Sequence, residues 1–118
     1  MKDNIVLTKS YLFAVRVVNL YKYLTEQKRE FVLSKQLLRS GTAVGALLKE
    51  AEHAQSRADF LNKINIALKE ANETEYWLKL LTDTHYLTQE EYENIQADCR
   101  EVCRLLISIV KTLKAIDK

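Results

Sequence analysis

Chain breakers are almost missing from this sequence. It contains no proline, and its 118 residues include only two glycines, Gly41 and Gly45, which both lie inside a stretch of helical periodicity. Tight turns and β-hairpins depend on glycine and proline at particular positions, so an all-β or loop-rich fold is disfavoured. The sequence therefore predicts an all-α protein in which almost every residue belongs to a helix.

Length and composition predict one soluble globular domain over residues 1–118. A chain of this size can bury one core but not two. Apolar residues make up 47% of the chain and charged residues 29%, a balance that disordered chains lack. The formal net charge of +2, from 18 basic and 16 acidic residues, does not by itself demand a nucleic-acid or membrane partner.

Apolar residues recur with helical spacing in four segments that are separated by short polar breaks. We expect helices over about Ile5 to Thr25, Phe31 to Glu52 or His53, Arg57 to about Asp83, and from Thr88 to near the end of the chain. Capping boxes, Ser56 with Asp59 and Thr88 with Glu91, mark the starts of the last two. Similar helix lengths and short loops predict an antiparallel up-down-up-down four-helix bundle.

The first helix carries two apolar stripes, although a helix of a monomeric bundle needs only one broad apolar face. We expect the first stripe to lie in the helix's own core: Leu7, Tyr11, Ala14, Val15, Val18 and Tyr21. We assign the second stripe to an interface between subunits: Phe13, Val17, Leu20 and Leu24. The alternative is a deeply packed helix in a monomer.

Each glycine in the second helix should cost about 1 kcal/mol relative to alanine, which makes sense where another backbone must come close. We therefore expect tight helix packing at Gly41 and Gly45. Near these glycines we also predict a polar network that fixes the register of helices two and three, made of Arg39, Glu50, Glu70 and Glu73.

The middle third of the chain resembles a known family. The matching segments are Gln36–Gly45, Glu50-Ala51, Ser56 with Asp59-Phe60, Ile66–Ala71 and Glu73–Leu78. They are similar to the four-helix bundle proteins first named for intervening sequences of 23S ribosomal RNA. The resemblance implies a homo-oligomer, with a pentamer as the expected assembly. It also implies a link to RNA or DNA, because a related branch comprises accessory proteins of diversity-generating retroelements.

Two groups of basic residues are candidates for contacts with nucleic-acid phosphates. On the second helix they are Lys35, Arg39 and Lys49, and on the fourth they are Arg100, Arg104 and Lys111. The alternative is that these side chains lie on solvated helix faces and pair with neighbouring acids. In that case the protein is a protein–protein interaction scaffold with no nucleic-acid role.

No motif of a catalytic site is present, whether a nucleophile elbow, a phosphate-binding glycine loop or a triad, so we expect no enzyme, no catalytic residues and no cofactor. Glu50 and His53 form a single Glu-x-x-His pair without the second pair that a di-metal bundle requires, so we expect no metal. Cys99 and Cys103 are expected to be ordinary small core residues. The N-terminus lacks the apolar block of a signal peptide, and we expect a cytoplasmic protein without a membrane segment.

Overall fold

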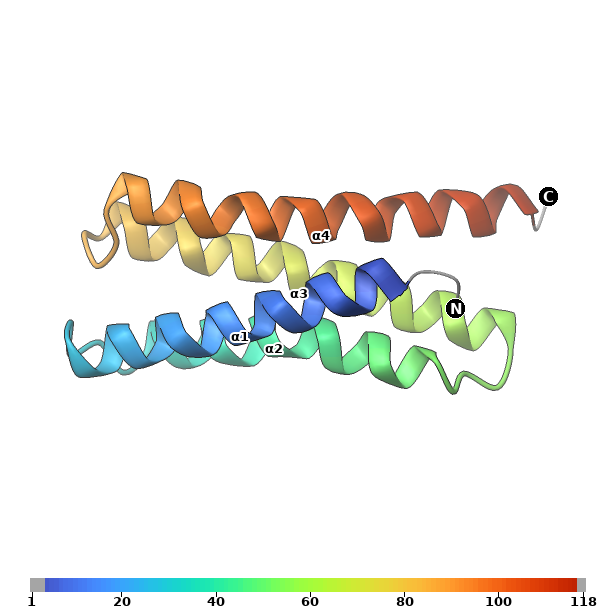
Figure 1. The fold of residues 1–118 in the computed structure, drawn as a ribbon, viewed down its shortest axis with the longest axis horizontal. Coiled ribbons are helices and arrows are strands. Elements are labelled where there is room, and N and C mark those ends of the chain that lie inside the picture. Colours follow the sequence, from blue (N-terminus) through green and yellow to red (C-terminus); the bar gives the residue numbers. More distant parts are fainter. Residues whose placement is uncertain (1–3, 117–118) are drawn as a thin grey trace.

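The computed structural model describes residues 4–116, which form four helices (Figure 1). These are α1 (Asn4–Glu26), α2 (Leu33–Ala51), α3 (Arg57–Asp83) and α4 (Gln89–Ile116). Successive helices run in opposite directions and pack side by side, giving a rod of 48 × 22 × 20 Å. The predicted up-down-up-down four-helix bundle is confirmed, and the contact between α1 and α4 is the smallest of its four helix–helix interfaces.

Both predicted capping boxes form. The Ser56 hydroxyl accepts the Asp59 amide proton at 3.0 Å, and the Asp59 carboxylate accepts from the amide of Gln55 at 3.2 Å. At the start of α4 the Thr88 hydroxyl accepts from the Glu91 amide at 3.1 Å, and the Glu91 carboxylate accepts from the Thr88 amide at 2.8 Å. Each exchange satisfies amides that have no partner within the helix, so α3 and α4 begin where the sequence predicts.

The connections after α1 and α3 each contain a residue in the left-handed region, although neither is a glycine. Arg29 has φ of 57° and His85 has φ of 72°. Around His85 the amides of His85 and Tyr86 bond the carbonyls of Thr82 and Leu81, which is the Schellman pattern of a helix C-terminus. Both residues lie at the same end of the bundle, where α1 and α3 end.

The start of α2 differs from the prediction because Glu30 caps it. The Glu30 carboxylate accepts hydrogen bonds from the amides of Val32, Leu33 and Ser34, the last at 2.6 Å. Burial raises the pKa of Glu30, but these amide donors outweigh burial and leave its pKa below the ordinary value. Since the capped helix begins at Leu33, Phe31, where we expected the helix to begin, lies before it and is exposed on the surface.

Each helix contributes one stripe of apolar side chains to a single core. The largest fully buried members are Phe13, Leu24, Leu37, Leu48, Ile64, Leu78, Leu81 and Leu106. A buried hydrogen bond crosses between α2 and α3, where the Thr74 hydroxyl donates to the Ser40 hydroxyl at 2.9 Å. The polar groups at this contact are therefore satisfied without water.

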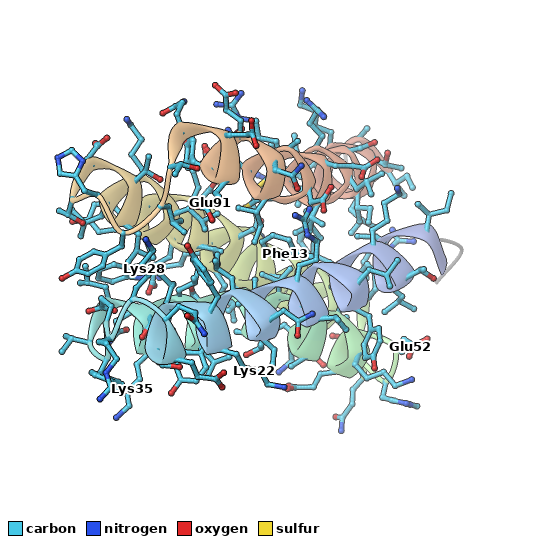
Figure 2. All side chains as sticks on the ribbon, turned by 60° about the vertical axis from the view of Figure 1, so that its left-hand side comes forward. Phe13, Lys22, Lys28, Lys35, Glu52 and Glu91 are labelled. Carbon is cyan, nitrogen blue, oxygen red and sulfur yellow. The ribbon has the colours of Figure 1, made fainter. Side chains whose placement is uncertain are left out.

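The second stripe of α1 is buried more deeply than the first, contrary to our prediction. Phe13, Val17 and Leu24, which we assigned to a subunit interface, are buried in the core of their own subunit. Figure 2 shows Phe13 pointing between the helices into the bundle. Tyr11 and Val15, which we expected in the core, are 68% and 41% exposed. The interface assignment is therefore wrong for those three residues.

The glycines of α2 explain which stripe of α1 is buried. A Cβ atom on Gly41 would lie 2.7 Å from both Cγ atoms of Val17, and one on Gly45 would lie 3.4 Å from the Ser10 carbonyl oxygen. Val17 therefore occupies the space that a side chain at position 41 would need. The close approach that the glycines predicted is between α2 and α1, and it draws the Phe13–Val17 face inward.

Candidate interaction surfaces

The outer face of α1 is apolar over its first three turns. Ile5, Tyr11 and Leu12 are more than half exposed, and Val15 is also exposed. The spacing of these residues keeps them on the side of α1 opposite the core. Contiguous apolar surface of this kind marks sites of interaction with other macromolecules more often than solvated surface does.

This apolar face continues into a groove between α1 and α2. The groove has a volume of about 640 Å³, and its lining comprises Leu7, Thr8, Tyr11, Leu12, Ala14, Thr42, Gly45, Ala46 and Lys49. It is hollow because small residues of the two helices, Ala14, Gly45 and Ala46, face each other there. We call these lining residues, together with Val15, the α1–α2 apolar groove.

The interface between α1 and α4 is polar by comparison. Arg16 reaches Asp98 at 2.5 Å and also bonds the Asn94 side chain, while Lys9 pairs with Glu101 at 3.1 Å. A shallower groove of about 400 Å³ lies beside Arg16. Leu20, the fourth residue that we assigned to a subunit interface, is partly buried and lines this groove.

The structure places Arg39 of α2 against two carboxylates of α3. Its guanidinium bonds Glu70 at 3.2 Å and also bonds Glu73, which accepts the Trp77 indole proton at 2.9 Å. Glu50, the fourth member of the predicted network, lies apart from this cluster and pairs with Lys63 at 3.1 Å. Both contacts link α2 to α3, so the register is fixed at two separate places.

The basic residues predicted on α2 therefore present little net positive charge. Arg39 is neutralised by Glu70 and Glu73, and Lys49 pairs with Glu52 at 3.2 Å. Lys35 alone of the three makes no ion pair within residues 4–116, and Figure 2 shows it extending away from the bundle. This face suits polyanions poorly.

The basic residues predicted on α4 keep more of their charge. Arg100, Arg104 and Lys111 are all exposed, and their spacing of four and seven residues places them on one side of the helix. Arg100 lies 3.7 Å from a Glu75 oxygen, which is a long ion pair. Arg104 and Lys111 have no carboxylate within ion-pair distance in the described part of the chain. We call these three residues the α4 basic stripe.

Sequence reasoning missed part of the exposed apolar surface. Ile5 and Leu12 are large apolar residues, but neither was included in a predicted stripe. His53 lies beyond the end of α2, so Glu50 and His53 do not share a helix face. Over residues 4–116, no three His, Cys, Asp or Glu side chains are grouped to hold a metal ion, and no helix is long and apolar enough to cross a membrane.

These features define the class of protein: an all-α four-helix bundle with one core. The family model of the 23S rRNA-intervening sequence proteins matches residues 2–108. The chain belongs to this family, as the segments of its middle third indicated.

A solved structure supports the same assignment. It is a protein of unknown function from the S23 ribosomal protein family of Bacteroides thetaiotaomicron, and it is 66% identical to this chain. The match covers 94% of this chain and 99% of that one, with a TM-score of 0.92. The comparison with curated proteins gives no match. Neither the family description nor the structure's description states an activity.

Proposed function

We propose that this protein is a non-enzymatic, cytoplasmic scaffold that assembles with copies of itself through the α1–α2 apolar groove. The observation that carries the proposal is the exposed apolar surface of Ile5, Tyr11, Leu12 and Val15 beside that groove. Removing apolar surface from water contributes about 25 cal/mol per Å², so covering these side chains favours association. The resemblance described above makes a ring of five subunits the expected assembly.

Light scattering on the purified protein over a range of concentrations tests self-association. The wild-type protein should be a multimer, and the double variant Leu12→Glu/Val15→Glu should shift toward the monomer because it places charges in the buried contact. The matched control is Lys22→Glu, an exposed position on the same helix outside the groove. A monomeric wild-type protein, or equal mass for both variants, would contradict the proposal.

Binding of RNA or DNA by the α4 basic stripe is the second function that we propose. It is supported by the exposed, nearly unpaired charges of Arg100, Arg104 and Lys111 on one helix face. In a multimer the stripe is repeated on every subunit, which raises avidity for a long polyanion without any new contact. The resemblance to the accessory proteins of diversity-generating retroelements also implies this ligand class.

An RNA retardation assay at low salt distinguishes this function from a scaffold without a nucleic-acid role. Wild-type binding should weaken steeply as salt rises, because each neutralised phosphate releases a counterion. The variant Arg100→Gln/Arg104→Gln/Lys111→Gln should bind far less, and Lys35→Gln on α2, which lies outside the apolar groove, should bind nearly as well as wild type. If retardation of the RNA changes neither with salt nor in either variant, the stripe does not bind RNA and the scaffold role alone remains.

A further inference from the structure

Two thiols lie next to each other where α4 packs against α3. Cys99 and Cys103 are one helical turn apart, a spacing that brings Cβ atoms to about 5–6 Å. The Cys99 thiol donates to the Ala71 carbonyl oxygen at 3.4 Å, and the Cys103 thiol lies 3.9 Å from the Asn72 side-chain oxygen. The two sulfurs are thus held at neighbouring positions along α3, and both cysteines are free thiols.

The two cysteines differ in their access to solvent. Cys99 is fully buried, whereas Cys103 is partly exposed at the edge of the α3–α4 interface. Cys103 is therefore the sulfur that an incoming ion reaches first.

We propose that Cys99 and Cys103 form a two-sulfur binding site for a soft monovalent cation of the Cu⁺ class. Thiolate ligands select soft ions, and a cation that accepts two ligands needs no other donor. Zinc would require four ligands, and no third His, Cys, Asp or Glu completes such a group within residues 4–116. Hard cations such as Mg²⁺ prefer oxygen donors and would not use this pair.

Binding exchanges protons for the metal without any change of oxidation state. Two S–H bonds break, two metal–sulfur bonds form and two protons leave to solvent, so the site changes from neutral to a charge of −1. Arg100 and Arg104 directly follow the two cysteines along α4, and their positive charges favour the anionic complex. The long contact of Cys103 with Asn72 is weak, so Cys103 can turn to receive the ion at little cost.

The test is an anaerobic titration of the reduced, full-length protein with Cu⁺ against a chromogenic copper chelator. The wild-type protein should retain one Cu⁺ per chain in competition with the chelator, and X-ray absorption should show two sulfur ligands on the copper. Cys103→Ser should abolish this chelator-resistant copper, and Zn²⁺ should not bind stoichiometrically. The variant Asn72→Ala, which keeps both sulfurs, should retain the site.

Cys99 is buried, so a variant there can fail for structural reasons. The copper binding of Cys99→Ala is therefore interpreted only if this variant still unfolds cooperatively on heating. In that case it should also lose copper. Cys103→Ser, at the more exposed position, provides the independent reading. If wild type surrenders all its Cu⁺ to the chelator, or if Cys103→Ser binds as much as wild type, the proposal is wrong.

Discussion

The two faces of α1 are similarly apolar but have opposite environments. The inner face, with Phe13 and Val17, is buried in the core, while the outer face, with Tyr11 and Val15, meets solvent. The inner face is the one that fits the backbone of α2 at Gly41, where Val17 fills the space of the missing side chain. The comparison teaches that shape complementarity with α2 decides which face of α1 is buried, because hydrophobicity alone favours neither.

Removing one aromatic ring from each face of α1 should show the difference in burial between the two faces most clearly. Phe13→Ala should lower the free energy of unfolding by about 3–5 kcal/mol, because it leaves a cavity in the core. Tyr11→Ala should change the stability of an isolated subunit by less than about 0.5 kcal/mol, since its ring is exposed. Denaturant unfolding at low protein concentration measures both, and equal losses would show that the outer ring is also buried.

Substitutions of the two glycines of α2 should give the next largest change in stability. Gly41→Ala should destabilise by about 1–3 kcal/mol through overpacking against Val17, partly offset by the better helix propensity of alanine. Gly45→Ala should be neutral or stabilising, because its Cβ atom would make an ordinary contact with the Ser10 carbonyl. A thermal melt of each variant checks this.

Val17→Ala in the Gly41→Ala background should recover part of the loss. Such a coupling is expected because the two side chains compete for the same space. Additive effects of the two substitutions would mean that Val17 does not set the cost at position 41.

The cap at Glu30 holds the connection that presents the inner face of α1 to α2. Glu30→Ala should cost about 0.5–2 kcal/mol, as the loss of other N-terminal caps does. Because the folded-state pKa of Glu30 lies below its ordinary value of 4.5, its ionised form contributes stability that is present above that value. This contribution is lost as pH falls below 4.5 through the lowered folded-state pKa.

Urea unfolding of wild type and Glu30→Ala between neutral and acid pH measures the effect. The difference in unfolding free energy should shrink toward the acid end, where protonation removes the charge of the wild-type cap. A difference that stays constant through this range would show that the charge of Glu30 is not what stabilises α2.

A substitution at the interface between α1 and α4 should have the smallest effect on stability. Arg16 and Asp98 both remain partly exposed to solvent, and exposed ion pairs contribute about 0.2–1 kcal/mol. Arg16→Gln should therefore lower stability only slightly, and added salt should reduce even that difference. A large loss on chemical denaturation would show that α1 is held by α4 as firmly as by α2.

The sequence predicted the helices well because periodicity and capping are local. Ser56 and Thr88 begin their helices as expected, and the spacing of apolar residues located α3 and α4 along the chain. The start of α2 was missed because its N-cap residue is Val32, and the carboxylate that accepts from the first amides belongs to Glu30, two residues earlier, where no capping serine, threonine, aspartate or asparagine is needed.

The orientation of α1 and the state of the basic residues could not be predicted in the same way. Periodicity reveals two stripes but contains no information on which one meets Gly41. Likewise, the sequence predicted that Arg39 joins Glu70 and Glu73, but only the packing of α2 on α3 shows that Glu50 lies apart from them and pairs with Lys63. The candidate surfaces depend on contacts between helices and so appear only in three dimensions.

The left-handed residues Arg29 and His85 have a practical consequence for anyone who wishes to engineer this molecule. Both glycines of the chain lie in α2, so the loops make their sharpest bends with residues that resist this conformation by about 1–2 kcal/mol each. Glycine at these two positions offers a route to a more heat-tolerant bundle. Both positions lie outside the α1–α2 apolar groove and the α4 basic stripe, so thermal tolerance can be raised independently of the surfaces proposed for recognition.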